Sequence, residues 1–220
     1  MKQIVLVTCM LMTVALEGWS QAQYDKEARQ LLDEISAKYK DMSFKAGFEF
    51  TLENRMAGTK DSFSGSVAVS GSKFWAANHK GIIVNDGEDV YTFLADAEEV
   101  NIDKYYPEEE EIGFHNIFTV YKEGYRYTLK EIQQNGNKLI QLDPEKEAAF
   151  SHIHLILKPN ATIERFVIFN KDGGLATYRL MDIEENADIP ADQFKLLKGS
   201  NEDQVLFEGE LVSVEVVDFR

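Results

Sequence analysis

The feature that most constrains the fold of this chain is a two-residue alternation of apolar with polar or small side chains, which begins at Ser43. Because successive side chains of a strand point to opposite faces, such alternation predicts strands with one buried face. Similar runs recur as far as Val216, and turn signals such as Asn85-Asp86-Gly87 separate them. We therefore expect a mainly β domain of about ten or more antiparallel strands. The apolar positions of the first run are Phe44, Ala46, Phe48, Phe50 and Leu52.

Two segments depart from this alternation and have the spacing of amphipathic helices. We expect the first over residues 25–40, with Asp25 as its N-cap. Its apolar stripe consists of Leu31, Leu32, Ile35 and Tyr39. The second follows four consecutive glutamates, which suit the first turn of a helix, and ends before Gly124. Its apolar positions are Ile112, Phe114, Ile117, Phe118 and Tyr121.

The number of expected strands limits the possible architectures. A long twisted sheet either closes into a barrel or curls, and a curled sheet has to be covered on its concave face. The two expected helices supply such a cover. The predicted fold is therefore a large curved antiparallel sheet forming an unclosed β-barrel, covered by an N-terminal helix and an inserted lid helix. Large aromatic side chains would line the concave space without filling it, which predicts an apolar ligand cavity.

The first 22 residues have the pattern of a cleavable export signal. Lys2 precedes the apolar stretch Ile4 to Leu16, and Ser20-Gln21-Ala22 provides small residues at the cleavage positions. This stretch is too short for a permanent membrane span. Cys9, the only cysteine, lies within it, and a lipobox around Cys9 would follow an unusually short apolar stretch. We expect residues 1–22 to be a signal peptide and residues 23–220 to form one domain without thiols.

Charge and motif content argue against nucleic-acid binding and catalysis. The formal net charge is −15 at pH 7, and a strongly acidic surface repels nucleic acids and anionic membranes. The sequence contains no Gly-x-Ser-x-Gly nucleophile elbow and no phosphate-binding loop. His152 and His154 have a spacing that can bind a metal, but no third ligand follows at a suitable distance. We expect no enzymatic activity, no cofactor and no metal site.

Several segments follow one another in a characteristic order. They are Leu31-Leu32-x-x-Ile35-x-x-x-Tyr39, Met42-Ser43-Phe44-Lys45-Ala46-Gly47-Phe48, Phe63-Ser64-Gly65-Ser66-Val67-Ala68-Val69, Lys73-Phe74-Trp75, Ile82-Ile83-Val84-Asn85-Asp86-Gly87 with Val90-Tyr91-Thr92-Phe93, Leu142-Asp143-Pro144-Glu145-Lys146, and Ile189-Pro190-Ala191-Asp192-Gln193-Phe194. In this order and spacing they resemble the outer-membrane lipoprotein carrier family, LolA. The resemblance covers nearly the whole predicted mature chain.

This resemblance implies a carrier in the periplasm of a Gram-negative bacterium. Such a carrier shields the acyl chains of lipoproteins in an apolar cavity and transfers them from the inner to the outer membrane. The implied partners are an acylated lipoprotein as cargo, an inner-membrane lipoprotein-releasing transporter and an outer-membrane acceptor. We expect the chain to act as a monomer. The expected cavity residues are Phe44, Phe48, Phe50, Phe74, Ile83, Tyr91, Phe93, Phe114, Ile117 and Phe118.

The chain departs from the family pattern before the predicted third strand. Better-studied members carry an Arg-Pro pair there, and that arginine is associated with holding the lid, whereas this chain has Ser70-Gly71-Ser72-Lys73. An ammonium group does not replace a forked guanidinium, so the role of Lys73 stays open, as does that of residues 205–220. Two other functions also stay open. One is a carrier of another amphiphile, such as a glycolipid or pigment lipid, and the other is an envelope assembly protein with a filled core.

Overall fold

The computed structural model describes residues 25–107, 112–199 and 202–220. The predicted export signal and the glutamate run at 108–111 lie outside these residues. The described part contains the helix α1 (Lys26–Tyr39) and two 3-10 turns, η1 (Val120–Lys122) and η2 (Ala191–Phe194). Its strands are β1 (Ser43–Asn54), β2 (Thr59–Ser70), β3 (Lys73–Asn78), β4 (Gly81–Asn85), β5 (Asp89–Leu94), β6 (Glu99–Lys104), β7 (Tyr125–Ile132), β8 (Lys138–Pro144), β9 (Phe150–Leu157), β10 (Ile163–Asn170), β11 (Gly174–Glu185), β12 (Leu197–Lys198), β13 (Gln204–Phe207), β14 (Glu210–Ser213) and β15 (Glu215–Asp218). No helix in these described ranges is long and apolar enough to cross a membrane.

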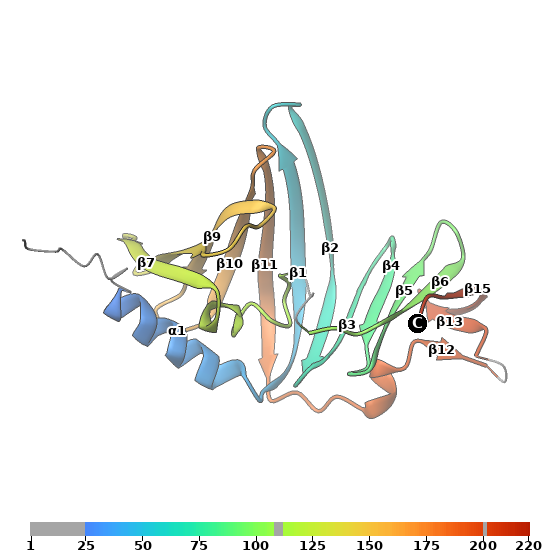
Figure 1. Ribbon diagram of the computed structural model, residues 1–220. Helices are drawn as coiled ribbons and strands as arrows, with labels where there is room; N and C mark the ends of the chain where they lie inside the picture. Colours follow the sequence, from blue (N-terminus) through green and yellow to red (C-terminus); the bar gives the residue numbers. More distant parts are fainter. Residues whose placement is uncertain (1–24, 108–111, 200–201) are drawn as a thin grey trace, which may run out of the picture.

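Twelve strands form one large sheet in the order β15-β6-β5-β4-β3-β2-β1-β11-β10-β9-β8-β7, and β12, β13 and β14 form a small second sheet. Figure 1 shows that the large sheet is curved and that its two outer strands, β7 and β15, lie at opposite ends of the molecule. The predicted curved, unclosed sheet is therefore confirmed. The expectation of antiparallel pairing is wrong at one edge, because β15 pairs parallel to β6.

The alternation in residues 43–52 sets the two faces of β1. Phe44 and Phe48 point to the concave face and are buried, and Phe50 follows them there as a partly buried residue. The predicted N-terminal helix is confirmed as α1, which packs on the same face near β7 (Figure 1). Leu32 and Ile35 of α1 belong to one apolar core with residues of β1 and β8–β11. The concave face is therefore filled at the α1 end of the sheet.

Asp25 fixes the start of α1 and at the same time protects an edge of the sheet. One carboxylate oxygen accepts hydrogen bonds from the backbone N–H groups of Glu27 (2.9 Å) and Ala28 (3.1 Å), as the predicted N-cap requires. The other oxygen accepts from the N–H of Leu129 in the edge strand β7 at 3.0 Å. The bonds from Ala28 and Leu129 lower the pKa of this carboxyl. One side chain therefore joins the helix to the sheet edge.

Replacing Asp25 with alanine is expected to destabilise the protein by about 1–2 kcal/mol at pH 7, because the helix loses its cap. Asp25→Asn, which keeps a cap oxygen, should lose less. Since folding lowers the carboxyl pKa, this stabilisation is present above pH 3.8 and is lost as the pH falls below it. Urea unfolding between pH 3 and pH 7 checks this, and a wild-type pH profile parallel to that of Asp25→Asn would contradict it.

The predicted lid helix over residues 112–121 is wrong. The segment consists of turns that end in η1, although it does cover the concave face of the sheet as expected. Although the apolar residues have helical spacing, local side-chain hydrogen bonds compete with the backbone hydrogen bonds of a helix. The Asn116 carboxamide accepts from the N–H of Gly113 at 2.9 Å, and the Thr119 hydroxyl donates to the carbonyl of Asn116 at 3.2 Å. Such bonds offer the backbone an alternative to a regular helix.

The C-terminal residues form a second core on the opposite, convex face of β4–β6. After β11, the chain crosses to this face and adds η2, the small sheet β12–β14 and the edge strand β15 (Figure 1). Phe194, Leu197 and Val205 pack there against Ile82 and Phe93. Of these residues, Phe194 ends η2 and Leu197 begins β12. Residues 205–220 thus cover one face of the sheet and pair with one of its edges.

Candidate ligand-binding cavity

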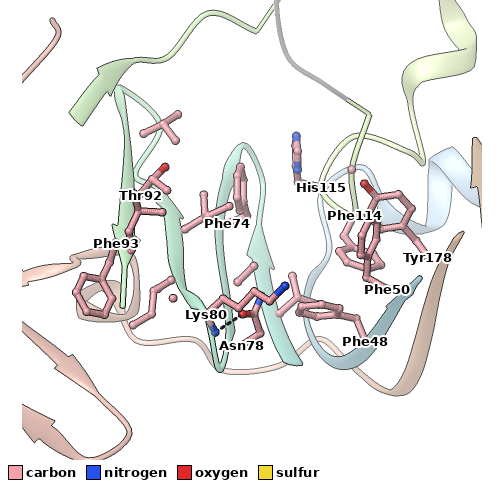
Figure 2. A pocket seen from close by; sticks show the side chains of 18 of the residues that line it. Phe48, Phe50, Phe74, Asn78, Lys80, Thr92, Phe93, Phe114, His115 and Tyr178 are labelled. Carbon is pink, nitrogen blue, oxygen red and sulfur yellow. Dashed lines mark hydrogen bonds between the residues drawn. The ribbon is translucent and has the colours of Figure 1, made fainter. Parts of the chain in front are cut away.

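A cavity of about 620 Å³ lies on the concave face, between strands β1–β5 and the segment beginning at Ile112 (Figure 2). The volume is within the roughly 300–1,000 Å³ that is usual for ligand sites. Aromatic side chains on its walls include Phe48, Phe50, Phe63, Phe74, Phe114 and Tyr178. These side chains belong to the neighbouring strands β11, β1, β2 and β3 and to residues 112–122, which we call the lid segment.

Ring-to-ring contacts join the aromatic side chains of the inner wall. The ring centroids of Phe50 and Tyr178 are 4.7 Å apart, those of Phe50 and Phe63 are 4.9 Å apart, and those of Phe48 and Phe114 are 5.1 Å apart. Tilted pairs at these separations are favourable and leave irregular spaces between the rings. The wall is therefore apolar and preformed.

Gly65 on β2 makes room for this wall. A Cβ atom at this position would lie 2.1 Å from the carbonyl oxygen of Ala77 and 2.7 Å from the Cζ of Phe48. Both separations are far below van der Waals contact, so any larger residue would displace the Phe48 ring or the backbone of β3. Glycine at residue 65 is what allows a phenylalanine on the neighbouring strand to lie across β2.

The lid segment touches the cavity through two consecutive rings. Phe114 is buried against the inner wall, and the imidazole of His115 stacks on Phe74 at a centroid distance of 4.3 Å with an interplanar angle of 13°. Figure 2 shows His115 beside Phe74, and Phe114 close to Tyr178. The lid segment therefore closes part of the cavity through ring contacts.

The side of the cavity toward β4 and β5 is open. Ile83 lies on the cavity face and is 41% exposed, which is high for an isoleucine beside a well-packed core. Polar groups gather along the cavity rim, where Asn78 projects from the end of β3 and Lys80 from the turn before β4 (Figure 2). Neither residue was predicted from the sequence, because Asn78 is a polar residue at the end of a strand and Lys80 lies in a turn, outside any periodic apolar pattern. The cavity thus has an apolar wall, a partial lid and a polar rim.

The expected cavity residues separate into three groups. Phe48, Phe50, Phe74, Ile83 and Phe114 line the cavity with their side chains on its face of the sheet or lid. Phe44, Ile117 and Phe118 lie in the adjoining core under α1, where the rings of Phe118 and Tyr39 stack at 4.2 Å. The third group contains Tyr91 and Phe93. The lipid-binding role of all ten residues stays a prediction.

Tyr91 and Phe93 have their side chains on the other face of β5, although Phe93 is among the residues that border the cavity. Both belong to the convex core, and the Phe93 ring is 5.2 Å from that of Phe207. Figure 2 shows the Phe93 side chain pointing away from the cavity, while Thr92 shares the cavity face with its cross-strand partner Ile83. Because side chains alternate along β5, only one of the two sets can face the cavity.

Tyr121 anchors the end of the lid segment to α1. Its hydroxyl donates a hydrogen bond to the carboxylate of Asp33 at 2.8 Å, and its ring is buried beside Tyr127 at a centroid distance of 6.1 Å. Burial, followed by the hydrogen bond to Asp33, raises the pKa of Tyr121 to about 12. The neutral phenol therefore holds the lid segment at its C-terminal end.

Replacing Tyr121 with phenylalanine is expected to destabilise the fold by about 1 kcal/mol at pH 8, because one hydrogen bond is lost. In the unfolded chain the phenol ionises near pH 10, so its stabilisation is complete below pH 10 and is lost as the pH rises toward 12. Wild type should therefore lose more stability than Tyr121→Phe between pH 9 and pH 11.5 in urea unfolding. If the two proteins lose the same amount of stability over this pH range, Tyr121 does not anchor the lid segment. The other tyrosines are present in both proteins, so their contribution cancels.

His152 and His154 lie on the face of β9 opposite the concave core. Their ring centroids are 4.8 Å apart, and His152 also stacks on Phe169 at 4.2 Å. His154 Nε2 is 3.3 Å from the Gln141 carboxamide oxygen, and burial lowers the pKa of both imidazoles. Across the described residues, no three His, Cys, Asp or Glu side chains come together in a way that would hold a metal ion. The pair therefore packs as neutral rings.

Lys73 is the cation nearest to the position of the Arg-Pro pair in the family pattern. It is the first residue of β3, follows the turn at Gly71 and is exposed. Its aliphatic stem approaches Gly87 of the neighbouring hairpin turn. Phe74, the residue after Lys73, does contact the lid segment through its stack with His115.

Sequence comparison decides the family. The family model of the outer membrane lipoprotein carrier protein LolA matches residues 40–197. This range includes the lid segment, η2 and every strand of the large sheet other than β15. The chain belongs to the LolA family. The region after the match contains β13, β14 and β15, so this part of the convex covering is an addition to the matched core. A comparison with curated proteins finds no match.

Several solved structures are similar to this LolA-family protein, and one of them, with a TM-score above 0.5, supports its fold. An uncharacterized conserved protein from Thermus thermophilus has a TM-score of 0.53 and 12% identity, over 88% of this chain and 99% of the other. A DUF1329 family protein from Desulfovibrio piger has a TM-score of 0.47 and 10% identity, over 77% and 96%. A LolA superfamily protein from Nitrosomonas europaea has a TM-score of 0.44 and 12% identity, over 76% and 97%. At these identities the likeness concerns the fold alone.

Proposed function

We propose that this LolA-family protein is a carrier that shields the acyl chains of lipoproteins in its concave cavity and transfers them from the inner to the outer membrane. The observation that carries the proposal is the open, aromatic-lined cavity between the sheet and the lid segment. An apolar space that the protein's own side chains leave unfilled is suited to acyl chains. The family match supports lipoproteins as the source of these chains.

The energetics suit a carrier that loads and unloads. Each methylene buried in the cavity gains roughly 0.8 kcal/mol. A chain that extends beneath the lid segment separates the lid from the wall there, which costs ring contacts such as that between Phe74 and His115. Entry also restricts the freedom of the chain. Binding is therefore moderate in net free energy, and a membrane acceptor is able to take the cargo over.

Partners and location follow from the same proposal. The carrier acts in the periplasm of a Gram-negative bacterium, receives cargo from an inner-membrane releasing transporter and delivers it to an outer-membrane acceptor. It works as a monomer and without enzymatic activity. The family match supports this setting, since its printed description is that of an outer membrane lipoprotein carrier.

The rival functions predict different behaviour of the cavity. A carrier of glycolipids or pigment lipids would use the same wall with another head group at the rim. An envelope assembly protein with a filled core would have no accessible apolar space. The exposure of Ile83 on the cavity face favours a carrier over the filled core.

Displacement of a hydrophobic fluorescent probe from the purified mature protein tests the proposal. Palmitate and a triacylated lipopeptide are expected to displace the probe saturably at low micromolar concentration, and the unacylated peptide should not. Native mass spectrometry of the same sample would detect bound lipid. A folded protein that binds neither the probe nor the lipopeptide would refute the carrier function.

A further inference from the structure

The cavity differs from the rest of the protein in the sign of its charge. The whole chain has 38 acidic and 23 basic residues. By contrast, the charged residues among the described lining of the cavity are Lys80 and Lys104, and both are cations. Within the described lining, these two ammonium groups create a local potential beside the apolar cavity that favours anions.

Lys80 is positioned where a head group would sit. It occupies the turn between β3 and β4, and its ammonium group lies 5.3 Å from the centroid of the Phe63 ring, on the aromatic wall. Figure 2 shows its side chain reaching across the rim toward Phe48. The ammonium therefore stands at the boundary between the apolar cavity and solvent, which is where the polar end of an amphiphile has to remain.

The present partner of Lys80 is easy to exchange. Its Nζ is 3.2 Å from the carboxylate of Asp61, and the two side chains are 53% and 66% exposed. An ion pair with this exposure contributes little stability, because water solvates both groups when they separate. An incoming carboxylate or phosphate can therefore take the place of Asp61 without a large penalty.

Lys104 is not available in the same way. Its Nζ lies 3.1 Å from Asp89, a residue that is only 7% exposed. Asp89 also pairs with Arg220 at 2.7 Å, and Arg220 in turn pairs with Asp218 of β15. Lys104 is thus part of a structural cluster that holds the C-terminal strand against the sheet. This leaves Lys80 as the exchangeable cation of the cavity.

We propose that the cavity prefers amphiphiles with an anionic head group, and that Lys80 selects them by exchanging Asp61 for the carboxylate or phosphate of the cargo. The inference rests on the proposed function, because it presupposes that acyl chains occupy the aromatic cavity. It adds a cargo class, namely single-chain or diacyl lipids with a negatively charged head. The acyl chains supply most of the affinity, and Lys80 supplies the discrimination.

The test compares two lipids that have the same acyl chain and differ in a single phosphate group. Displacement of the fluorescent probe is measured with 1-palmitoylglycerol 3-phosphate and with 1-palmitoylglycerol, both below their critical micelle concentrations. The phosphate form is expected to bind about tenfold more tightly at low salt, and the difference should shrink as salt screens the ammonium group. Inorganic phosphate is the chain-free control and should leave the probe bound.

Three variants separate selection from folding. Lys80→Met keeps the aliphatic stem and should reduce the preference for the phosphate form about five- to tenfold, with the neutral lipid unchanged. Asp61→Asn removes the competing carboxylate and should increase that preference two- to threefold. Lys60→Met changes an exposed lysine next to Asp61 that does not line the cavity, and it should behave as wild type. Opposite effects at Lys80 and Asp61 are not produced by a general loss of structure.

Each outcome has a distinct meaning. Equal displacement by the two lipids, or a preference that survives Lys80→Met, would overturn the role of Lys80 while the acyl cavity stands. Displacement of the probe by inorganic phosphate as strong as by the phospholipid would overturn the amphiphile class. Failure of both lipids to displace the probe would refute the proposed acyl cavity itself and remove the basis of the inference.

Discussion

Ile83→Glu is expected to lower the affinity for acyl chains about thirtyfold or more while the protein stays folded. Ile83 lies on the cavity face between Ala76 and Thr92 of the neighbouring strands. An acyl chain in the cavity would cover the new carboxylate and leave it without a hydrogen-bond partner. Burying an unpaired charged group costs several kcal/mol, and about 2 kcal/mol already corresponds to a thirtyfold change.

Folding should survive this substitution because Ile83 is 41% exposed. Water can solvate the carboxylate as long as the cavity is empty, so we expect a loss of stability below about 1 kcal/mol. Leu211→Glu is the matched control. Leu211 is 59% exposed on β14, outside the cavity lining, and the substitution makes the same change in charge and polarity.

The measurement is the dissociation constant of the fluorescent probe together with urea unfolding of each variant. Leu211→Glu should bind the probe as wild type does. If Ile83→Glu binds it equally well, acyl chains occupy another part of the molecule and the assignment of the cavity is wrong. If both variants lose affinity, the effect comes from the added negative charge and not from its position.

The architecture was predictable because burial in a sheet has a period of two. Phe44, Phe48 and Phe50 are spaced so that any strand through them has an aromatic face, and the structure places that face on the concave side. The turn at Asn85-Asp86-Gly87 was also predictable from the sequence, because a glycine at this place permits the φ of 97° that Gly87 adopts and that other residues avoid. Local rules thus sufficed for most strands and for α1.

The choice of face in β5 was not predictable in the same way. Alternation assigns Tyr91 and Phe93 to one face and Thr92 to the other, but it does not say which face is concave. The apolar set does face a core, but this core lies on the convex face of β4–β6, whereas the concave face of β4 and β5 is open toward the cavity. The convex core is completed by residues such as Phe194, Leu197 and Val205, which are far away in the sequence.

Two other features depend on contacts that no local pattern encodes. The parallel pairing of β15 with β6 joins Val216 to Val100, and loop closure over such a distance leaves no signal in either segment. The selecting role proposed for Lys80 depends on where a turn brings its ammonium group. In the sequence, Lys80 is one of many charged residues, and only the fold places it on the rim of an apolar cavity.

The covered convex face leads to the second large prediction. Phe93→Ala is expected to destabilise the protein by about 3–5 kcal/mol, because Phe93 is 2% exposed and its removal leaves a void between β5 and the C-terminal core. Its contact with Phe207, at 5.2 Å, is lost as well. Binding of the probe should nevertheless stay within about twofold of wild type under conditions where the variant is folded, since the ring points away from the cavity.

Thr92→Val is the matched control for this prediction, because residue 92 is the next position on β5 and faces the cavity. It should change stability by less than about 1 kcal/mol and leave the convex core intact. A loss of probe binding in Phe93→Ala with little loss of stability would mean that the Phe93 ring belongs to the cavity wall. The opposite result is a large loss of stability with unchanged binding. It would mean that the convex core stabilises β4–β6 and thereby the cavity on their other face.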